Sequence, residues 1–147
     1  LKKLEISFNK KVTICLHPKS NYELYKKYFN DFEIVQFKIT EKIKSAYIVI
    51  FHESTAINDA LTLKKRIIRL HTSMLGNYME NRIKLYDHYK FVTFSLDSNI
   101  NLNKEDLLIE LNDNKDKHYK FFKEEFFLDN EISVEKKIIN HIKNYEI

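Results

Sequence analysis

The sequence predicts an α/β fold with a doubly wound, mostly parallel sheet of about five strands and helices on both faces. Short apolar segments alternate along the chain with segments whose apolar residues repeat at helical spacing. Residues 47–51 are continuously apolar, which is typical of a strand buried on both faces of a parallel sheet. The 147 residues are 44 % hydrophobic, which is sufficient for one domain with a substantial core.

Five segments have the length and apolar character of strands. They are residues 12–16, 33–37, 47–51, 66–70 and 91–95. The segments between them predict helices. These cover residues 21–30, 40–45, 55–64, 78–86 and 104–111. In the first of these, Tyr22, Tyr25 and Phe29 lie three and four residues apart, and Thr40 is placed as the N-cap of the second.

The end of the chain predicts a helical tail. A polar stretch at 112–117 is expected to be a linker, and the tail over 115–147 is expected to dock on the domain or on a missing N-terminal half. Ser133 is expected to cap a last helix whose apolar face includes Val134, Ile138 and Ile142. We therefore expect residues 1–147 to form a single domain. Because residue 1 is Leu and not Met, we expect a piece of a longer chain or a processed product.

Composition excludes several function classes. Gly76 is the single glycine and does not follow a strand, so neither a P-loop nor a glycine-rich dinucleotide loop is present. The net charge of +4 is too small for a strong nucleic-acid footprint. The six histidines and the lone Cys15 have no metal-ligand spacing, so we expect no metal, and we expect no cofactor. One cysteine excludes an internal disulfide and fits a reducing compartment.

Two polar motifs follow predicted strands. His17-Pro18 ends the first strand, and Ser54-Thr55 follows the third and begins a helix. Ligands of open parallel sheets bind outside the carboxyl ends of the strands, and an imidazole beside a hydroxyl-capped helix start is suited to phosphate. Each motif also has a structural interpretation, as a strand terminator with a hydrogen-bonded histidine and as a plain N-cap. The two motifs converge only if their strands are near neighbours.

These motifs resemble those of GT-B glycosyltransferases in their C-terminal, donor-binding half. The most similar members are bacterial sialyltransferases and capsule or lipooligosaccharide transferases, which carry an HP motif and a paired Ser/Thr motif. The resemblance covers most of residues 12–70 and, loosely, the tail near 131–138. It implies a Rossmann-like domain that binds a CMP-activated sugar for the synthesis of surface polysaccharide or lipooligosaccharide.

The resemblance also implies roles for individual residues. His17 would contact the donor phosphate, Ser54 and Thr55 would bind it, and the loop 37–39 would lie near the cytosine. Apart from the resemblance, Glu53 is a candidate to bind ribose hydroxyls, and the alternative is a surface carboxylate favoured by the dipole of the following helix. The nucleotide-binding residues expected on this basis are His17, Pro18, Lys19, Phe37, Lys38, Ile39, Glu53, Ser54 and Thr55.

One departure from the family pattern limits the expected activity. The family's general base lies in an acidic pair followed by glycine, and no acidic pair precedes Gly76. We therefore expect the isolated chain to be inactive, with a glycan or glycolipid acceptor bound through an N-terminal GT-B domain. Glu53 and Asp59 are the candidates for an unrecognised base. The expected location is the cytoplasm, and peripheral contact with the inner face of the cytoplasmic membrane is compatible with such an acceptor.

A second function class stays open. A non-catalytic α/β interaction or signalling module would have the same alternation of strands and helices. A receiver-like signalling domain needs an acidic cluster at the ends of its first and third strands, where this chain has His17 and His52-Glu53. Binding of CMP separates the nucleotide hypothesis from the module hypothesis.

Overall fold

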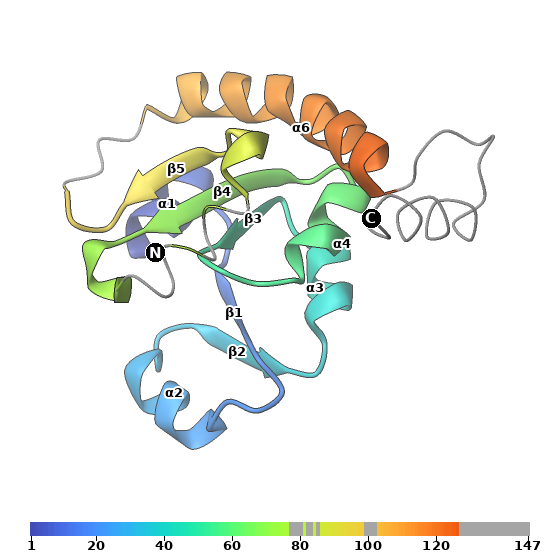
Figure 1. The fold of residues 1–147 in the computed structure, drawn as a ribbon. Coiled ribbons are helices and arrows are strands. Elements are labelled where there is room, and N and C mark those ends of the chain that lie inside the picture. The colour runs from blue at the N-terminus through green and yellow to red at the C-terminus, as the bar shows by residue number, and fades with distance from the viewer. Residues whose placement is uncertain (77–80, 82–83, 85, 99–102, 127–147) are drawn as a thin grey trace, which may run out of the picture.

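A computed structural model describes residues 1–76, 81, 84, 86–98 and 103–126, and its secondary structure is α/β (Figure 1). The helices are α1 (Lys2–Phe8), α2 (Tyr22–Tyr28), α3 (Ile39–Ser45), α4 (Ile57–Thr62) and α6 (Lys104–Phe126). The strands are β1 (Thr13–Leu16), β2 (Glu33–Gln36), β3 (Ile48–Phe51), β4 (Arg66–His71) and β5 (Val92–Ser95). Two short 3₁₀ helices, Ser73–Leu75 and Asp87–Tyr89, precede β5.

The strands form two parallel sheets, which corrects the expectation of one five-stranded sheet. β1 pairs with β2, and β3, β4 and β5 pair in that order. The strand segments and their parallel direction are as predicted, but β1 and β3 belong to different sheets. Apolar character identifies a strand, whereas its pairing partner depends on contacts between distant segments. Each strand here has only four to six residues, so each provides few ladder hydrogen bonds to specify a neighbour.

The three-stranded sheet is buried on both faces. On one face, Ile68 and Val92 pack with Phe8 of α1 and with Leu107 and Leu111 of α6. On the other face lies a second cluster, which includes residues of α3, α4 and α6. Its members are Ile43, Phe51, Ile57, Ala60, Leu61, Ile67, Tyr89, Phe91 and Phe122. Helices therefore cover both faces of this sheet, as a doubly wound arrangement requires.

The β1–β2 sheet is much less buried. Leu16 is the only buried residue of these two strands, and α2 has no buried residue. In Figure 1 this sheet and α2 extend below the three-stranded sheet, on the side away from α6. The chain thus has one well-covered sheet and one partly exposed sheet.

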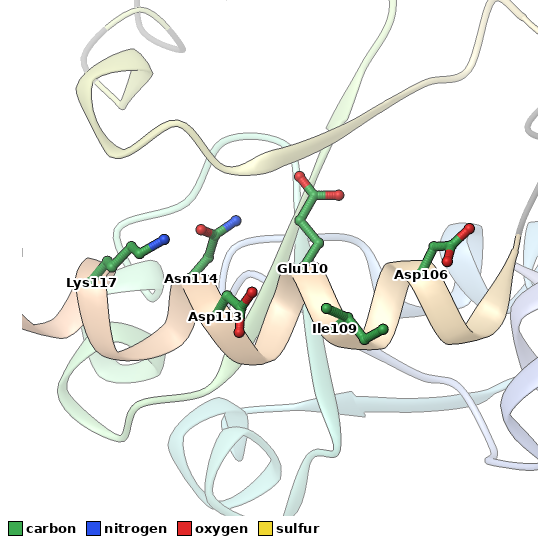
Figure 2. Close-up of a pocket in the computed structure, with 6 residues that line it drawn as sticks. All are labelled: Asp106, Ile109, Glu110, Asp113, Asn114 and Lys117. Carbon is green, nitrogen blue, oxygen red and sulfur yellow. The ribbon is translucent and has the colours of Figure 1, made fainter.

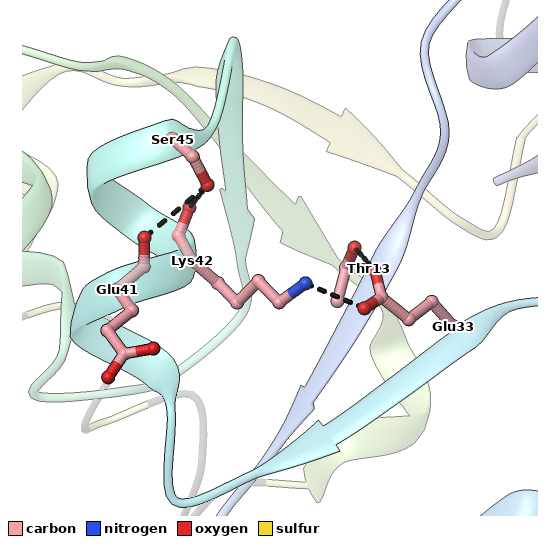
Figure 3. Close-up of polar contacts among 5 residues, drawn as sticks. All are labelled: Thr13, Glu33, Glu41, Lys42 and Ser45. Carbon is pink, nitrogen blue, oxygen red and sulfur yellow. Dashed lines mark hydrogen bonds and ion pairs between the residues drawn. The ribbon is translucent and has the colours of Figure 1, made fainter.

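A polar cluster links the β1–β2 sheet to α3. Lys42 Nζ lies 2.6 Å from Glu33 Oε1, and the Thr13 hydroxyl donates to Glu33 Oε2 at 2.6 Å (Figure 3). The first of these contacts, followed by the Thr13 hydrogen bond, lowers the pKa of the Glu33 carboxyl. The Ser45 hydroxyl in the same view donates to carbonyl oxygens of its own helix. Through Lys42, α3 therefore holds the starts of β1 and β2.

The predicted linker at 112–117 is helical, because α6 runs without interruption from Lys104 to Phe126. Its buried residues Leu107, Leu111, His118 and Phe122 share one face, and the polar stretch lies between two of them. Asn112 Oδ1 accepts a hydrogen bond from Arg66 Nε at 2.8 Å, which ties this stretch to β4. The burial of the flanking residues therefore outweighs the low helix propensity of Asn and Asp.

Three further expectations meet different outcomes. Thr40 is not an N-cap: α3 begins after Lys38, and the Thr40 hydroxyl instead donates to Asp59 Oδ2 at 2.6 Å.

Helix α1 was not predicted, because its apolar pattern is only two turns long. The helix predicted over 78–86 falls mostly outside the described residues, and the one after Ser133 falls entirely outside them. None of the helices in the described ranges is long and apolar enough to cross a membrane.

Candidate functional site

A tight turn follows β1 at its carboxyl end. The Ser20 N–H donates to the His17 carbonyl at 2.9 Å, which closes a β-turn with Pro18 at its second position. The ring of proline presets the backbone angle that this position requires. Asn21 then accepts a hydrogen bond from the Leu24 N–H and caps α2. The turn is therefore defined on one side by the strand and on the other by the helix.

The His17 ring is oriented by its own turn. Its Nδ1 lies 3.1 Å from the Lys19 N–H and accepts from it. In the neutral ring this contact leaves the proton on Nε2, which is then a donor. Because His17 is exposed, the Nε2–H group is accessible to a ligand.

A side chain of β2 holds the same turn. Gln36 pairs in register with Leu16, and its Nε2 atom lies 3.1 Å from the His17 carbonyl oxygen. It also lies 3.0 Å from the carbonyl oxygens of Pro18 and Ser20. Gln36 was not among the predicted site residues. Its only signal in the sequence is its position within the predicted strand 33–37, next to the loop 37–39.

The loop 37–39 lies beside this turn, because β1 and β2 are paired neighbours. Phe37 has a positive φ of 67°, which is uncommon for a residue with a side chain, and its side chain is 75 % exposed. Lys38 is exposed, but Ile39 packs against the cluster around Ile43 and Leu61. Phe37 and Lys38 are therefore available to a ligand, whereas Ile39 belongs to the core.

The charge at this edge is positive. Lys19 and Lys38 are both exposed, and neither forms an ion pair with a carboxylate of the described residues. Together with the His17 donor, they make the carboxyl edge of the β1–β2 sheet suited to an anion. We call His17–Ser20 with Gln36, Phe37 and Lys38 the β1–β2 edge.

The second predicted motif lies at the end of β3. Ser54 Oγ accepts from the Ala56 N–H at 3.2 Å, and the Ser54 carbonyl accepts from the Ile57 N–H at 3.2 Å. Thr55 is exposed, and its carbonyl accepts from the Asn58 N–H at 3.1 Å. This segment is therefore the turn into α4, and the helix itself begins at Ile57, two residues later than predicted.

The two predicted motifs do not share a sheet. His17 ends β1 and Ser54 follows β3, and no hydrogen bond within the described ranges joins His17 to Ser54 or Thr55. Glu53 is half-buried beside Ser54. Of the nine predicted residues, the group from 17 to 19 and the group from 37 to 39 directly follow two neighbouring strands, β1 and β2. The group from 53 to 55 lies at the end of another sheet.

A third polar group links the ends of β4 and β5. The Ser73 N–H donates to Asp97 Oδ2 at 2.6 Å, and the Thr72 hydroxyl donates to Asp97 Oδ1 at 2.7 Å. The Ser73 backbone contact, followed by the Thr72 hydroxyl, lowers the pKa of the Asp97 carboxyl. Sequence analysis did not single out these residues. Their hydrogen bonds join two loops, which is a structural role.

Two surface hollows lie along α6, away from all nine predicted site residues. Figure 2 shows one, whose lining side chains all belong to α6: Asp106, Ile109, Glu110, Asp113, Asn114 and Lys117. The other is lined by His88, Phe121, Glu124 and Glu125. Both hollows contain carboxylates, but no group of three His, Cys, Asp or Glu side chains that could hold a metal ion occurs within the described part of the chain.

Comparison with known proteins gives no relative. No protein-family model, curated protein or solved structure matches the chain. The chemistry of the β1–β2 edge is therefore the main indication of function.

Proposed function

We propose that this chain is the donor-binding domain of a bacterial glycosyltransferase that uses a CMP-activated sugar. The observation that carries the proposal is the ordered turn after β1, in which His17 Nδ1 is occupied by the Lys19 N–H. The exposed Nε2–H can then donate to a phosphate oxygen. This is the contact that the resemblance to sialyltransferase-like enzymes assigns to the HP motif.

The surrounding charges support binding of a phosphate at this edge. Lys19 and Lys38 are exposed, and hydrogen bonds from charged donors to phosphate are among the stronger polar contacts. Phe37 is exposed next to Lys38, and an exposed ring is suited to stacking on a base. We assign Phe37 to the cytosine and the His17 turn to the phosphate.

Ser54 and Thr55 are assigned a second phosphate contact. Ser54 Oγ uses a lone pair to accept from the Ala56 N–H, so its hydroxyl proton can still donate to an oxygen of the ligand. Thr55 is exposed at the same turn. A nucleotide that contacts both motifs has to bridge the two sheets, because each motif follows a strand of a different sheet.

Transfer of the sugar requires a base and an acceptor site from elsewhere. Asp59, one of the two candidate bases, already accepts a hydrogen bond from the Thr40 hydroxyl and so joins α4 to α3. We therefore propose that an N-terminal GT-B domain supplies the base and binds the glycan or glycolipid acceptor. On this proposal the isolated chain binds CMP but does not transfer sugar.

An alternative function is a non-catalytic interaction module. The observation that favours it is the exposure of α2, which has no buried residue and carries exposed Tyr22, Leu24, Tyr25 and Tyr28. Such a helix is suited to contact with another protein. The CMP experiment below distinguishes the two functions.

Calorimetric titration of CMP into the chain tests the nucleotide proposal. We expect weak binding, together with a rise in melting temperature, because a ligand that binds only the native state stabilises it. His17→Ala should weaken CMP binding by at least about tenfold, since one charge-assisted hydrogen bond is lost. His88→Ala, which changes an exposed histidine beside α6, is the matched control and should bind CMP as the unmodified chain does.

The double variant Ser54→Ala/Thr55→Ala tests the bridge between the sheets. We expect it to weaken CMP binding by at least about tenfold beyond any loss of folding, which circular dichroism monitors. Unchanged affinity in this variant would confine the nucleotide to the β1–β2 edge. No binding of CMP at millimolar concentration by the unmodified chain would contradict the proposed function and favour the interaction module.

A further inference from the structure

The Gln36 side chain makes an unusual number of contacts with one turn. Its Nε2 atom lies within 3.1 Å of the carbonyl oxygens of His17, Pro18 and Ser20. A side-chain amide has two N–H donors, so at least one proton is shared between two of these acceptors. The ladder between β1 and β2 is already complete at Leu16 and Gln36 without these bonds. The amide therefore acts on the turn that follows the strand, rather than on the strand.

These bonds determine which polar groups of the turn remain for a ligand. All three carbonyl oxygens point to the Gln36 amide, and the His17 carbonyl also accepts from the Ser20 N–H. The Lys19 N–H is used by His17 Nδ1. The donors Nε2–H of His17 and Nζ of Lys19 belong to exposed residues of this turn. With three of the four carbonyl oxygens of the turn bound to Gln36 and these two donors exposed, the turn favours a ligand that offers acceptor oxygens.

We propose that Gln36 is a positioning residue that fixes the His17–Ser20 turn with three of its four carbonyl oxygens directed to the Gln36 amide, so that the turn recognises anions. The identity of the anion, the phosphate of CMP, rests on the proposed function. The effect of Gln36 on the turn does not depend on the proposed function, because every contact involved is within the chain. Gln36 touches no ligand in this account and acts only through the turn.

The backbone beside Gln36 is consistent with this role. Phe37 follows it directly and has a φ of 67°, a conformation that costs free energy for a residue with a side chain. Such conformations persist where surrounding contacts enforce them. The three hydrogen bonds of Gln36 hold the residue that immediately precedes Phe37 against the His17 turn.

The test uses the tautomer of His17, which can be measured without a ligand. Long-range ¹H–¹⁵N spectra of the histidine rings at pH 8 should show His17 in the Nε2–H form in the unmodified chain. Gln36→Leu removes the donors, and we expect the two tautomers of His17 to become mixed. Gln36→Glu keeps the shape of the side chain but places a carboxylate, which repels them, beside the three carbonyl oxygens. It should mix the His17 tautomers to the same or a larger extent. Ser45→Ala, which removes hydrogen bonds to carbonyl oxygens of α3, is the matched control and should leave His17 unchanged.

Titration of CMP provides the second measurement. We expect Gln36→Leu to weaken CMP binding roughly tenfold, with circular dichroism and melting showing a folded chain. Mixed tautomers together with no CMP binding by any variant, including the unmodified chain, would support the positioning role and contradict the proposed nucleotide. An unchanged His17 tautomer in folded Gln36→Leu and Gln36→Glu would overturn the positioning role, whatever CMP does.

Discussion

His118 is a buried titratable residue in an aromatic environment. Its side chain is 5 % exposed, and its ring packs edge-on against Phe91 and Tyr89. Nδ1 of this ring has no hydrogen-bond partner among the residues that the structure describes. Burial lowers the pKa of His118 from 6.5 to about 4, opposed by a backbone hydrogen bond at Tyr89 and aided by the charge of Lys117. The neutral ring is therefore the form that the folded chain accommodates.

This residue should make stability depend on pH. Below pH 6.5 the unfolded chain binds a proton at His118, whereas the folded chain binds it only near pH 4. The free energy of unfolding is therefore not reduced by His118 above pH 6.5. It falls as the pH decreases from 6.5 to about 4, by up to about 3 kcal/mol. Urea unfolding at pH 7.5 and pH 4.5 measures this difference, which His118→Leu should reduce and His52→Gln, at an exposed position, should not.

The acidic groups affect a different pH range. The pKa values of Glu33 and Asp97 are lowered from 4.5 and 3.8, so their contributions are lost at lower pH than that of His118. An equal pH dependence in His118→Leu and the unmodified chain between pH 6.5 and pH 4.5 would contradict the assignment to His118.

At the scale of elements, α6 shows how burial overrides local composition. Its buried residues Leu107, Leu111, His118 and Phe122 lie on one face along the helix. The segment 112–117 between them is therefore helical, although its Asn and Asp content is typical of a loop. Asn103 caps the start of the helix, since its Oδ1 accepts from the Glu105 N–H.

Substitution by proline in the segment 112–117 should show whether this segment is a stable helix or a linker. Asn114→Pro should destabilise the chain by about 3 kcal/mol or more, because proline removes a helical hydrogen bond and clashes with the preceding turn. Lys104→Pro is the matched control, since it lies at the first helical position, where proline is tolerated. Urea unfolding measures both variants. Equal, small effects would indicate that 112–117 behaves as a linker.

The sequence was most informative where the pattern is local. All five strands were predicted within two residues, because short apolar segments between polar ones are visible without knowledge of their partners. The expectation of one five-stranded sheet was wrong, because the division into a β1–β2 sheet and a β3–β4–β5 sheet depends on long-range contacts. The His17 turn and the loop 37–39 were predicted as site residues, but Gln36 was not, because three hydrogen bonds to backbone carbonyls have no sequence signature.

At the scale of the whole molecule, the two sheets should differ in stability. β4 contributes Ile67 and Ile68, which are buried on opposite faces of the three-stranded sheet, whereas the β1–β2 sheet has Leu16 as its only buried residue. Regions with few buried apolar contacts open with lower free energy than the core. The candidate ligand edge thus lies on the less stable part of the chain, where binding can order the structure.

Amide hydrogen exchange tests this difference. We expect the amides of β4 to be protected roughly a hundredfold more than those of β2 and α2, because β4 opens only with the whole core. Saturating CMP should slow exchange in β1 and β2, whose local opening breaks the proposed contacts, and in β4, because global opening also releases the ligand. Equal protection of the two sheets would contradict the separation of their cores. Slower exchange in β4 without slower exchange in β1 and β2 would indicate that CMP binds outside the β1–β2 edge.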